Sequence, residues 1–479
     1  MIVGQVIELK ANNKFFTYCR KAFGVRRFSY NWAVAKFKKD YVAHCAAMDR
    51  YTRELAEYKK SPLQSTVVPV KPKLPSWQDY KKEFNAIRLE KYPFTYEVIK
   101  YASQQAFVNF GRAVSDYFEN VKKRKKSKVK TNSKKRKAFF PKFKKKSYQH
   151  GSFYIGGDQV KIVTGKACSK KLENHSTKQY MNIPNFGYVQ LKEKLRFNGH
   201  INGVTISQRA DRIYASFSIE ITDEEYLRTH KAAVQNNTAA GIDLGLKSAL
   251  MLSDGISIDS PKPLKAKLRK LSRLQRQLNR KQHPRTKDDK TELSRNYIKF
   301  SKKVSKLYLE ITNIREDFSQ KISSVLANHY EYLCMEDLNV KGMMANHKLA
   351  RAISDVGFYN IKKNLTYKME FKHRKLQEVD RFYASSKSCS KCGALKKDLT
   401  LRDRVYECPE CGLNIDRDLN AAINLRQQIK IVGVASSELK PVELTALLSD
   451  LAMNGITTSS VEAGIWSKTY KFIAFYIFL

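Results

Sequence analysis

The sequence predicts an α/β multidomain protein, and three observations support this fold class. Residues 151–222 alternate between apolar and polar positions and place Gly and Asn at turns, which is typical of several short strands. Helical periodicity instead dominates residues 23–60, 77–121 and 263–328. Near the C-terminus, two Cys-x-x-Cys pairs are separated by fifteen residues. A chain of 479 residues has material for roughly two to four domains.

The N-terminal part is predicted to begin with a strand and two helical segments. Residues 1–10 alternate like a short strand, and the helical pattern of residues 23–60 follows. The helical pattern of residues 77–121 is broken at Pro93. Between the two helical segments, four prolines forbid a helix and predict an extended connector: Pro62, Pro69, Pro72 and Pro75. The several short strands of residues 151–222 suggest a barrel.

The stretch from Lys122 to Lys146 is the most basic part of the chain. It holds fifteen Lys and Arg residues among twenty-five and no acidic residue. A charge run of this kind is usually a solvated segment. This run lies between ordered-looking segments and ends in aromatic residues, as in Phe140-Pro141-Lys142-Phe143-Lys144. We therefore expect a loop that grips the backbone of RNA or DNA.

The C-terminal half is predicted to alternate between strands and helices after a polar linker at residues 224–238. The expected elements are a strand-turn-strand unit, two long basic helices interrupted around His283-Pro284, an apolar strand and a further helix, at residues 239–259, 263–328, 332–335 and 349–372. The cysteine pairs come next, and a last helix is expected to start near Leu419.

The four cysteines predict a structural zinc ribbon. Two Cys-x-x-Cys turns can close a tetrahedron of thiolates around one zinc ion, and no ligand position is left for a substrate. The Gly that follows each pair suits a turn that needs a positive φ. These residues are Cys389, Cys392, Cys408 and Cys411, with Gly393 and Gly412.

Two disulfides are the alternative interpretation of the same cysteines. No basic segment followed by a long apolar stretch begins the chain, so we expect no secretion signal. The other cysteines, Cys19, Cys45, Cys168 and Cys334, are scattered as buried free thiols would be. A reducing cytosol fits this pattern, and zinc is the better explanation there.

The charge of the chain points to nucleic acid as a partner. It carries 90 Lys and Arg against 45 Asp and Glu, a net charge of +45. A surplus of this size repels itself unless a polyanion neutralises it. The 26 Tyr and 25 Phe could stack on bases. A membrane surface is the competing polyanion, but the late apolar run from Phe472 to Leu479 is far shorter than the ~20 residues that span a bilayer.

Three acidic residues are predicted to form a catalytic site. Asp243 lies in a strand, Glu336 ends another strand and Asp418 opens the last helix. Carboxylates from two strands and a C-terminal helix form the cluster of an RNase H-like fold, which holds two Mg²⁺ ions roughly 4 Å apart. Each acid alone is weak evidence, because Asp beside Gly is usually a turn and Glu after a strand is usually a cap. Asp337 and Asp416 are the competing neighbours: Asp416 could cap the last helix, and Asp337 could be a surface acid.

These motifs resemble the TnpB family of transposon-encoded RNA-guided DNA endonucleases, which are related to type V CRISPR effectors. The specific matches are Gly241-Ile242-Asp243-Leu244-Gly245, Met335-Glu336-Asp337-Leu338-Asn339-Val340, the segment from Ser385 to Gly393, Cys408-Pro409-Glu410-Cys411-Gly412 and the segment from Asp416 to Leu425. Less specific matches are residues 24–32, 140–144, 313–318 and 352–355. The resemblance covers about residues 1–427.

The resemblance implies a RuvC nuclease domain whose catalytic acids are Asp243, Glu336 and Asp418, interrupted by the zinc ribbon. The guide would be an RNA from the transposon end, and double-stranded target DNA would be cut beside a short flanking motif by a monomer in the prokaryotic cytosol. The implied domains are residues 1–20 (first part of a wedge barrel), 21–121 (helical recognition insert), 122–225 (basic loop and rest of the barrel), 239–380 (RuvC, first part), 381–415 (zinc ribbon), 416–430 (RuvC, last part) and 431–479 (a tail for which the sequence allows disorder).

Three other functions compete with this prediction. A nuclease-inactive RNA-guided DNA-binding regulator would be expected to lack one of the three acids. A transposase that acts alone on single strands would resemble enzymes with a His-hydrophobic-His metal site, and no His-x-His occurs in the chain. A compact type V CRISPR effector differs partly in its genetic locus, so the sequence leaves this alternative open.

Overall fold

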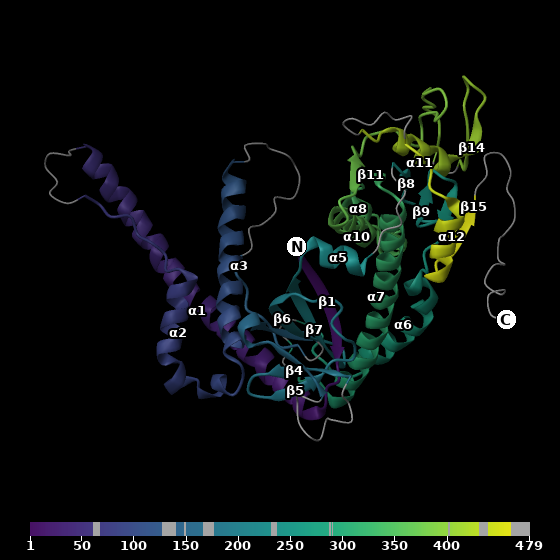
Figure 1. Cartoon of the computed structure of the whole chain (residues 1–479). Helices are drawn as coiled ribbons and strands as arrows, with labels where there is room; N and C mark the ends of the chain where they lie inside the picture. The colour runs from purple at the N-terminus through teal and green to yellow at the C-terminus, as the bar shows by residue number, and fades with distance from the viewer. Residues whose placement is uncertain are drawn as a thin grey trace. The chain divides into compact units, whose positions relative to one another are not determined.

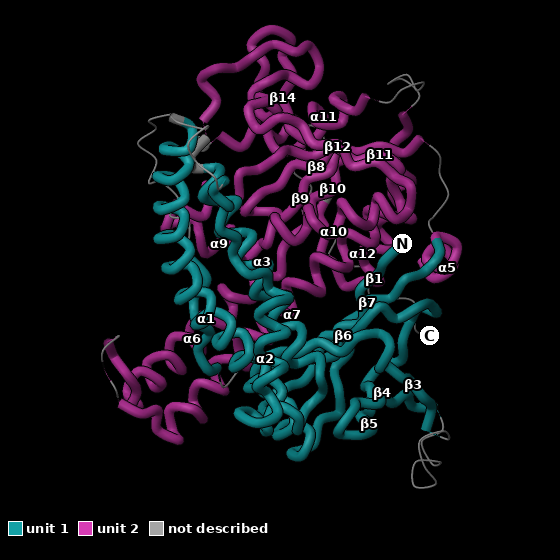
Figure 2. The backbone as a smooth tube through the Cα atoms, turned by 90° about the vertical axis from the view of Figure 1, so that its left-hand side faces the viewer, with its two compact units in different colours: residues 1–222 teal, residues 223–479 magenta. Residues whose placement is uncertain are grey.

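The computed structural model describes residues 1–60, 68–126, 140–147, 150–165, 177–230, 237–286, 289, 291–400, 403–430 and 439–460. The chain divides into two compact units, residues 1–222 and 223–479 (Figure 2). This mixed α/β, multidomain organisation agrees with the predicted fold class. Among the helices of the described residues, none combines the length and the apolar character needed to cross a bilayer.

Unit 1 contains two antiparallel sheets. The larger has the strand order β1-β7-β6-β2 and the smaller has the order β3-β4-β5. An isolated bridge between Leu9 and Leu191 links the two sheets. The predicted barrel stays a prediction, because the strand pairs describe two open sheets joined at this bridge. The strands are β1 (Ile2–Leu9), β2 (His150–Gly156), β3 (Lys161–Thr164), β4 (Gln179–Ile183), β5 (Gly187–Gln190), β6 (His200–Arg209) and β7 (Arg212–Glu220).

The helices of unit 1 lie between β1 and β2 in the chain (Figure 1). They are α1 (Asn13–Lys60), α2 (Trp77–Lys91) and α3 (Lys100–Lys126), with the short 3₁₀ helix η1 (Pro93–Tyr96) at the predicted proline break. Helix α1 begins ten residues before the predicted start, because the Asn12 side chain accepts a hydrogen bond from the Phe15 amide at 2.8 Å and caps it. An aromatic core that includes Phe37, Phe84 and Phe107 holds these helices together.

Unit 2 is built on a six-stranded sheet with the order β12-β11-β8-β9-β10-β15. Strands β8, β9 and β10 pair antiparallel, and β11 and β12 follow β8 as parallel neighbours. The strands are β8 (Ala239–Asp243), β9 (Leu250–Leu252), β10 (Ile256–Ile258), β11 (Tyr332–Glu336), β12 (Lys375–Val379) and β15 (Thr458–Ser460). Buried residues of this sheet and of the helices beside it form one apolar core.

The helices of unit 2 follow the predicted order, with several differences. They are α5 (Asp223–Thr229), α6 (Pro263–Asn279), α7 (Arg295–His329), α8 (Val340–Met343), α9 (Ala350–Val356), α10 (Phe358–Phe371), α11 (Arg417–Gln427) and α12 (Leu444–Met453). Part of the predicted linker at 224–238 forms α5. The single helix predicted at 349–372 is divided at Gly357, whose φ of 78° ends α9.

Disorder is the wrong description for residues 439–460 of the tail. Helix α12 buries Leu447 and Leu451 in the unit 2 core, and β15 pairs antiparallel with β10. The sequence motifs stop near residue 427, so they carried no signal for this added strand. Residues 431–438 and 461–479 lie outside the described part.

Candidate active site and cysteine cluster

Two of the predicted acids lie at the same edge of the unit 2 sheet. Asp243 is the last residue of β8 and Glu336 is the last residue of β11. The two strands are parallel, and Met335 is opposite Ile242 in their register. The next residue of each strand is therefore an acid, and neighbouring strands are only about 4.8 Å apart. The sheet thus places Asp243 and Glu336 side by side.

Helix α11 brings the third acid to this edge. It packs against β8, β9 and β11, as seen at the top of Figure 1. Asp416 is its N-cap and Asp418 lies in its first turn. A Cβ built on Gly241 of β8 would meet the carbonyl oxygen of Ala422 at 2.0 Å, so only glycine allows this approach of helix and strand.

The electrostatics of Asp243 reflect the convergence of the three acids. Its pKa is raised from 3.8 to about 8, first by burial, then by the negative charges of Asp418 and Glu336. The positive charge of Arg417 acts in the opposite direction. A cation bound among the three carboxylates would relieve this repulsion, and oxygen ligands are those that Mg²⁺ prefers. By its chemistry, a set of three carboxylates therefore suits a divalent cation such as Mg²⁺.

Glu336 is held by a residue of the segment that leads to the cysteine cluster. The buried Ser385 donates its hydroxyl to Oε1 of Glu336. Burial raises the pKa of Glu336, and this hydrogen bond acts against the shift. Asn424 of α11 in turn donates to the carbonyl oxygens of Ser385 and Ser388 at 2.7 Å each. Helix α11 therefore fixes the loop that orients Glu336.

Asp418 is paired with arginines on its own side of the site. Its Oδ1 accepts hydrogen bonds from Arg417 Nη2 at 2.9 Å and Nε at 3.2 Å, and Arg404 Nη1 lies 3.9 Å from Oδ2. The Asp418 carboxylate is therefore held by arginine side chains on the side of α11.

The two competing acids have structural partners instead. Asp416 Oδ1 accepts from the amides of Asp418 and Leu419 at 2.9 and 3.1 Å, which confirms the predicted helix cap. Asp337 pairs with Lys362 at 2.9 Å and with Arg381 at 2.5 Å, and these hydrogen bonds lower its pKa. Asp337 therefore behaves as the surface acid that the sequence allowed.

The four predicted cysteines come together as a group that could hold a metal ion. Their sulfur atoms all lie within 4.8 Å of one another. The Sγ atoms of Cys389 and Cys411 are 3.6 Å apart, and those of Cys392 and Cys408 are 3.5 Å apart. Four thiolates at Zn–S bonds of ~2.3 Å would be about 3.8 Å apart, so the geometry fits a tetrahedral zinc site.

The glycines and neighbours of the cluster explain its shape. Gly393 and Gly412 have φ of 79° and 68°, as predicted for turns that present two sulfurs. Two short strands, β13 (Val405–Glu407) and β14 (Asn414–Asp416), join the second pair of cysteines to α11. Cys389, Cys408 and Tyr406 share a small apolar core with Leu419 and with other residues. The cysteine cluster and the helix of Asp418 are thus one packed body.

Sequence reasoning missed the roles of Ser385, Arg417 and Asn424. All three lie inside motifs noted for other residues, next to the first cysteine pair or in the Asp416–Leu425 segment. Their partners are 49, 1 and 36–39 residues away. Ser385 and Asn424 could therefore be marked as candidates, but their contacts depend on the tertiary fold.

Comparison with known proteins covers the same segments. Residues 216–347 match a family described as probable transposase (OrfB_IS605), and residues 358–425 match a Cas12f1-like TNB domain. The first segment holds Asp243 and Glu336, and the second holds Asp418 and the four cysteines. Acids and cysteines thus fall within two adjacent family matches.

Named relatives agree with these matches. A protein of Streptomyces pristinaespiralis is 35% identical over 235 residues, which are 49% of this chain and 53% of that protein. InsQ of Escherichia coli K12 is 26% identical over 305 residues, 60% of this chain and 68% of InsQ. Both carry the name "Putative RNA-guided DNA endonuclease". The chain spans about half the length of the Streptomyces relative. The solved Cas12f1–sgRNA–target DNA complex aligns with 89% of this chain and 99% of that one at 13% identity, with a TM-score of 0.28.

Two family models thus match adjacent segments of this chain, and the named relatives are called putative RNA-guided DNA endonucleases. They confirm the resemblance to the TnpB family that the sequence motifs predict.

Proposed function

We propose that this protein is an RNA-guided DNA endonuclease, encoded by a transposable element, that cuts its target with Asp243, Glu336 and Asp418. The observation that supports the proposal is the position of Asp243 and Glu336 at one sheet edge, beside the helix that carries Asp418. The raised pKa of Asp243 agrees with three acids close together. The names of the relatives supply the substrate class.

The chemistry assigned to the site is hydrolysis of a phosphodiester. Two bound Mg²⁺ ions would supply an activated water and stabilise the leaving oxygen. Asp243 and Glu336 would hold them from the sheet and Asp418 from the helix. Ser385 keeps the Glu336 carboxylate in one orientation, and the Asp416 cap fixes the turn that carries Asp418. Positioning of this kind decides how well a metal-dependent site works.

The order of the strands supports the assignment of unit 2 to an RNase H-like RuvC domain. Three antiparallel strands, β8, β9 and β10, are followed by the parallel strands β11 and β12 on the other side of β8. For unit 1, we infer that its two linked sheets form the wedge barrel and α1 to α3 the recognition insert. The cysteine cluster is assigned to a structural zinc ion, since all four ligands are thiolates.

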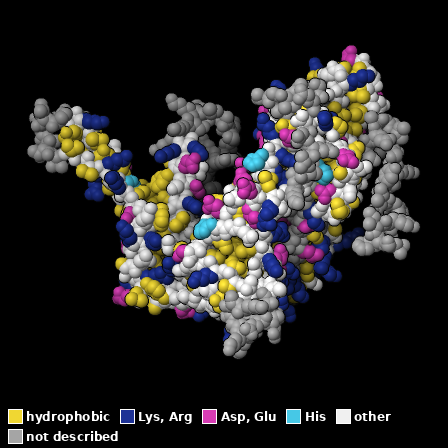
Figure 3. Space-filling view, in the orientation of Figure 1, with side chains coloured by type: hydrophobic (Ala, Val, Ile, Leu, Met, Phe, Trp, Pro, Cys, Tyr) yellow, Lys and Arg dark blue, Asp and Glu magenta, His cyan; other side chains and the backbone are white. Residues whose placement is uncertain are grey.

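Nucleic acids are the partners that this assignment requires. The net charge of +45 supports binding of a guide RNA and a double-stranded target. Figure 3 shows Lys and Arg side chains spread over the visible surface rather than gathered in one patch. We infer a guide taken from the transposon end, a short flanking motif in the target, a monomeric protein and a cytosolic location.

The test is sequencing of the RNA that co-purifies with the full chain, followed by cleavage of a plasmid that matches that RNA, with Mg²⁺ and with a chelator. Mg²⁺-dependent cutting at the matched site is the expected result. The absence of cutting by a chain that carries RNA and binds the matched plasmid would overturn the proposal and favour a nuclease-inactive regulator.

A compact type V CRISPR effector is the second candidate, favoured by the Cas12f1-like match over residues 358–425. The same sequencing separates the two. An RNA that continues from a transposon end supports the first function, and an RNA with a CRISPR repeat supports the second.

A further inference from the structure

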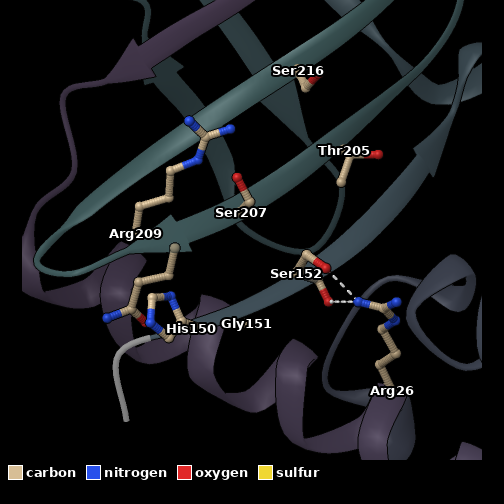
Figure 4. Close-up of a pocket in the computed structure, with 9 residues that line it drawn as sticks. Arg26, His150, Gly151, Ser152, Thr205, Ser207, Arg209 and Ser216 are labelled. Carbon is tan, nitrogen blue, oxygen red and sulfur yellow. Dashed lines mark hydrogen bonds between the residues drawn. The ribbon is translucent and has the colours of Figure 1, made fainter. Parts of the chain in front are cut away.

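An open pocket of about 600 Å³ lies on the larger sheet of unit 1 (Figure 4), and its lining includes neither the three acids nor the four cysteines. Six of its lining residues carry the argument: Arg26, Ser152, Thr205, Ser207, Arg209 and Ser216. They come from α1, β2, β6 and β7, and no lining residue is acidic. The pocket therefore offers positive charge and hydrogen-bond donors, without a carboxylate to neutralise them.

The register of the sheet builds a row of hydroxyl groups across three strands. Ser152 is opposite Ser207, and Thr205 is opposite Ser216. These side chains are half-buried, whereas the alternate residues such as Ile206 face the core. The side chains of Thr205, Ser207 and Ser216 form no hydrogen bond with the described part of the chain. Within the described residues, these hydroxyl groups are therefore open to water or to a ligand.

Two arginines and a histidine stand beside this row. Arg26 Nη1 donates hydrogen bonds to Ser152 O at 2.9 Å and to Ser152 Oγ. Nε and Nη2 of Arg26 donate no hydrogen bond to the described residues and are available to a ligand. The Arg209 guanidinium lies over the Tyr214 ring at 5.2 Å and has no ion pair within the described residues. The His150 ring likewise makes no hydrogen bond to that part of the chain.

A further cation lies close to Arg26. Lys144 places Nζ 3.9 Å from the centre of the Tyr30 ring, and its pKa is lowered first by burial and then by the charge of Arg26. Lys144 belongs to the end of the basic stretch, and the Ser147 hydroxyl three residues later accepts a hydrogen bond from the His150 amide at 3.1 Å. The basic stretch therefore leads directly to the pocket.

Water alone satisfies many hydroxyl groups on the open face of an antiparallel sheet. The distinguishing feature here is the group of cations, which repel one another when no anion is present. A phosphate group would bind both the hydroxyls and the cations, because its oxygens accept hydrogen bonds from hydroxyls and pair with guanidinium groups. Side chains two residues apart on a strand are spaced by about 6.8 Å, so the row can follow an extended chain of phosphates.

We propose that this pocket binds the sugar–phosphate backbone of a nucleic acid, with Arg26 and Arg209 on the phosphates and Thr205, Ser207 and Ser216 donating further hydrogen bonds. The partner class rests on the proposed function, whereas the site is separate from the residues that would cut DNA. Guide RNA and target DNA share this backbone, and the test distinguishes them.

The test measures binding of the full chain to a labelled single-stranded RNA and to a DNA duplex over a series of salt concentrations. Arg209→Ala is expected to weaken binding about three- to tenfold and to lower the slope of log K against log salt by ~0.7–0.9. The double variant Thr205→Val/Ser207→Ala keeps side-chain size and should weaken binding with the slope unchanged. Arg20→Ala, an exposed arginine of the same helix as Arg26, is the matched control and should bind as the unchanged protein does.

The circular dichroism spectrum and the melting temperature of each variant establish that it is folded. A loss confined to RNA assigns the pocket to the RNA backbone, and a loss confined to the duplex assigns it to DNA. Unchanged affinity and slope in both folded variants would overturn the inference. Because the readout is binding, a chain that fails to cut DNA can still support this site, and an active nuclease can still contradict it.

Discussion

Gly241 of β8 lies directly against Ala422 of α11: a Cβ at position 241 would be 2.0 Å from the Ala422 carbonyl oxygen and 2.5 Å from the Arg426 amide nitrogen. This contact holds the helix of Asp418 against the strand of Asp243. Both neighbours are backbone atoms, so a larger side chain at position 241 could fit only if the helix or the strand moved.

The first prediction concerns this contact. Gly241→Ala should lower the free energy of unfolding by about 1–3 kcal/mol, as overpacking does, and should reduce cleavage more than binding. Chemical denaturation and guided cleavage measure the two effects. Gly24→Ala is the control, because nothing lies within 4 Å of its added Cβ in α1 and the change should stabilise that helix by about 0.5–1 kcal/mol. Equal stability of both variants would show that helix and strand are not locked together.

The second prediction concerns the choice of acids. Asp243→Ala, Glu336→Ala and Asp418→Ala should each abolish cleavage, because a metal ion loses a ligand, and should retain binding through phosphate contacts elsewhere. Asp337→Ala should still cleave and should lose little stability, since ion pairs of partly exposed side chains contribute little. Guided plasmid cleavage and a gel-shift with the same guide separate the two properties.

Asp416 supplies the sharpest control for that series. Asp416→Asn keeps an N-cap and should cleave normally, and Asp416→Ala should lose about 1 kcal/mol of stability. Asp418→Asn should not cleave, because an amide is a poorer metal ligand than a carboxylate. If Asp418→Asn cleaves DNA and Asp416→Asn does not, the assignment of Asp418 as the catalytic acid is wrong, and Asp416 takes that role.

The third prediction is that the cysteine cluster binds one zinc ion and stabilises the fold. Cys408→Ser should reduce bound zinc from about one per chain towards zero and lower the melting temperature, because metal binding contributes folding free energy. Elemental analysis and a thermal scan measure this. Cys45→Ser, an exposed cysteine of α1, is the control and should keep its zinc. Stoichiometric zinc in Cys408→Ser would contradict the assignment.

The fourth prediction concerns the basic stretch from Lys122 to Lys146. Residues 127–139 lie outside the described part, whereas Phe140 stacks on Phe37 at 5.3 Å and anchors the end of the stretch. Replacing several of its lysines with glutamine should weaken nucleic-acid binding and lower the salt slope by ~0.7–0.9 for each lost contact. Lys192→Gln is the control, because Lys192 pairs with Glu8 at 2.5 Å. An unchanged slope would make the stretch a solvated loop.

The fifth prediction is a pH dependence of stability from Lys368. Its Nζ donates to Gln320 O, Ser323 Oγ and Ser324 Oγ at 2.6–2.8 Å, and burial lowers its pKa from 10.5 to about 7. Between these two values the unfolded chain binds the proton and the folded chain does not. Stability should therefore rise as pH increases from about 7 towards 10.

Urea unfolding at several pH values between 6 and 9 tests this in the unchanged protein and in Lys368→Met. The variant should show a smaller increase, although Lys372, whose pKa is lowered to about 8 mainly by burial, still contributes. The same increase in both proteins would mean that Lys368 is charged throughout.

Local patterns were sufficient to predict most elements and the residues of the candidate site. The sequence placed Asp243 within a strand and Glu336 at the end of another, and in the structure each is the last residue of its strand. The Asp416 cap was visible three residues before Leu419. The cysteine spacing predicted a cluster that the fold assembles. The catalytic role of the three acids stays a prediction.

Other features depend on contacts between distant residues, which single-chain patterns do not contain. The hydrogen bond from Ser385 to Glu336 joins residues from two separate motifs. Strand β15 has three residues, too few for a periodic signal. It forms by antiparallel hydrogen bonding to the unpaired edge of β10. The division of the helix at Gly357 was missed because a lone glycine inside a helical pattern is often tolerated.

The insertion of the cysteine cluster between β12 and α11 also sets an order in time. The ribosome makes Asp243 first, Glu336 later and Asp418 only after the last cysteine. At about 5–20 residues per second, the first and third acids are separated by roughly ten to thirty seconds of synthesis. A chain that is still growing therefore carries only two of the three acids of the proposed site. The site can be completed only once the cysteine segment has emerged and α11 can dock.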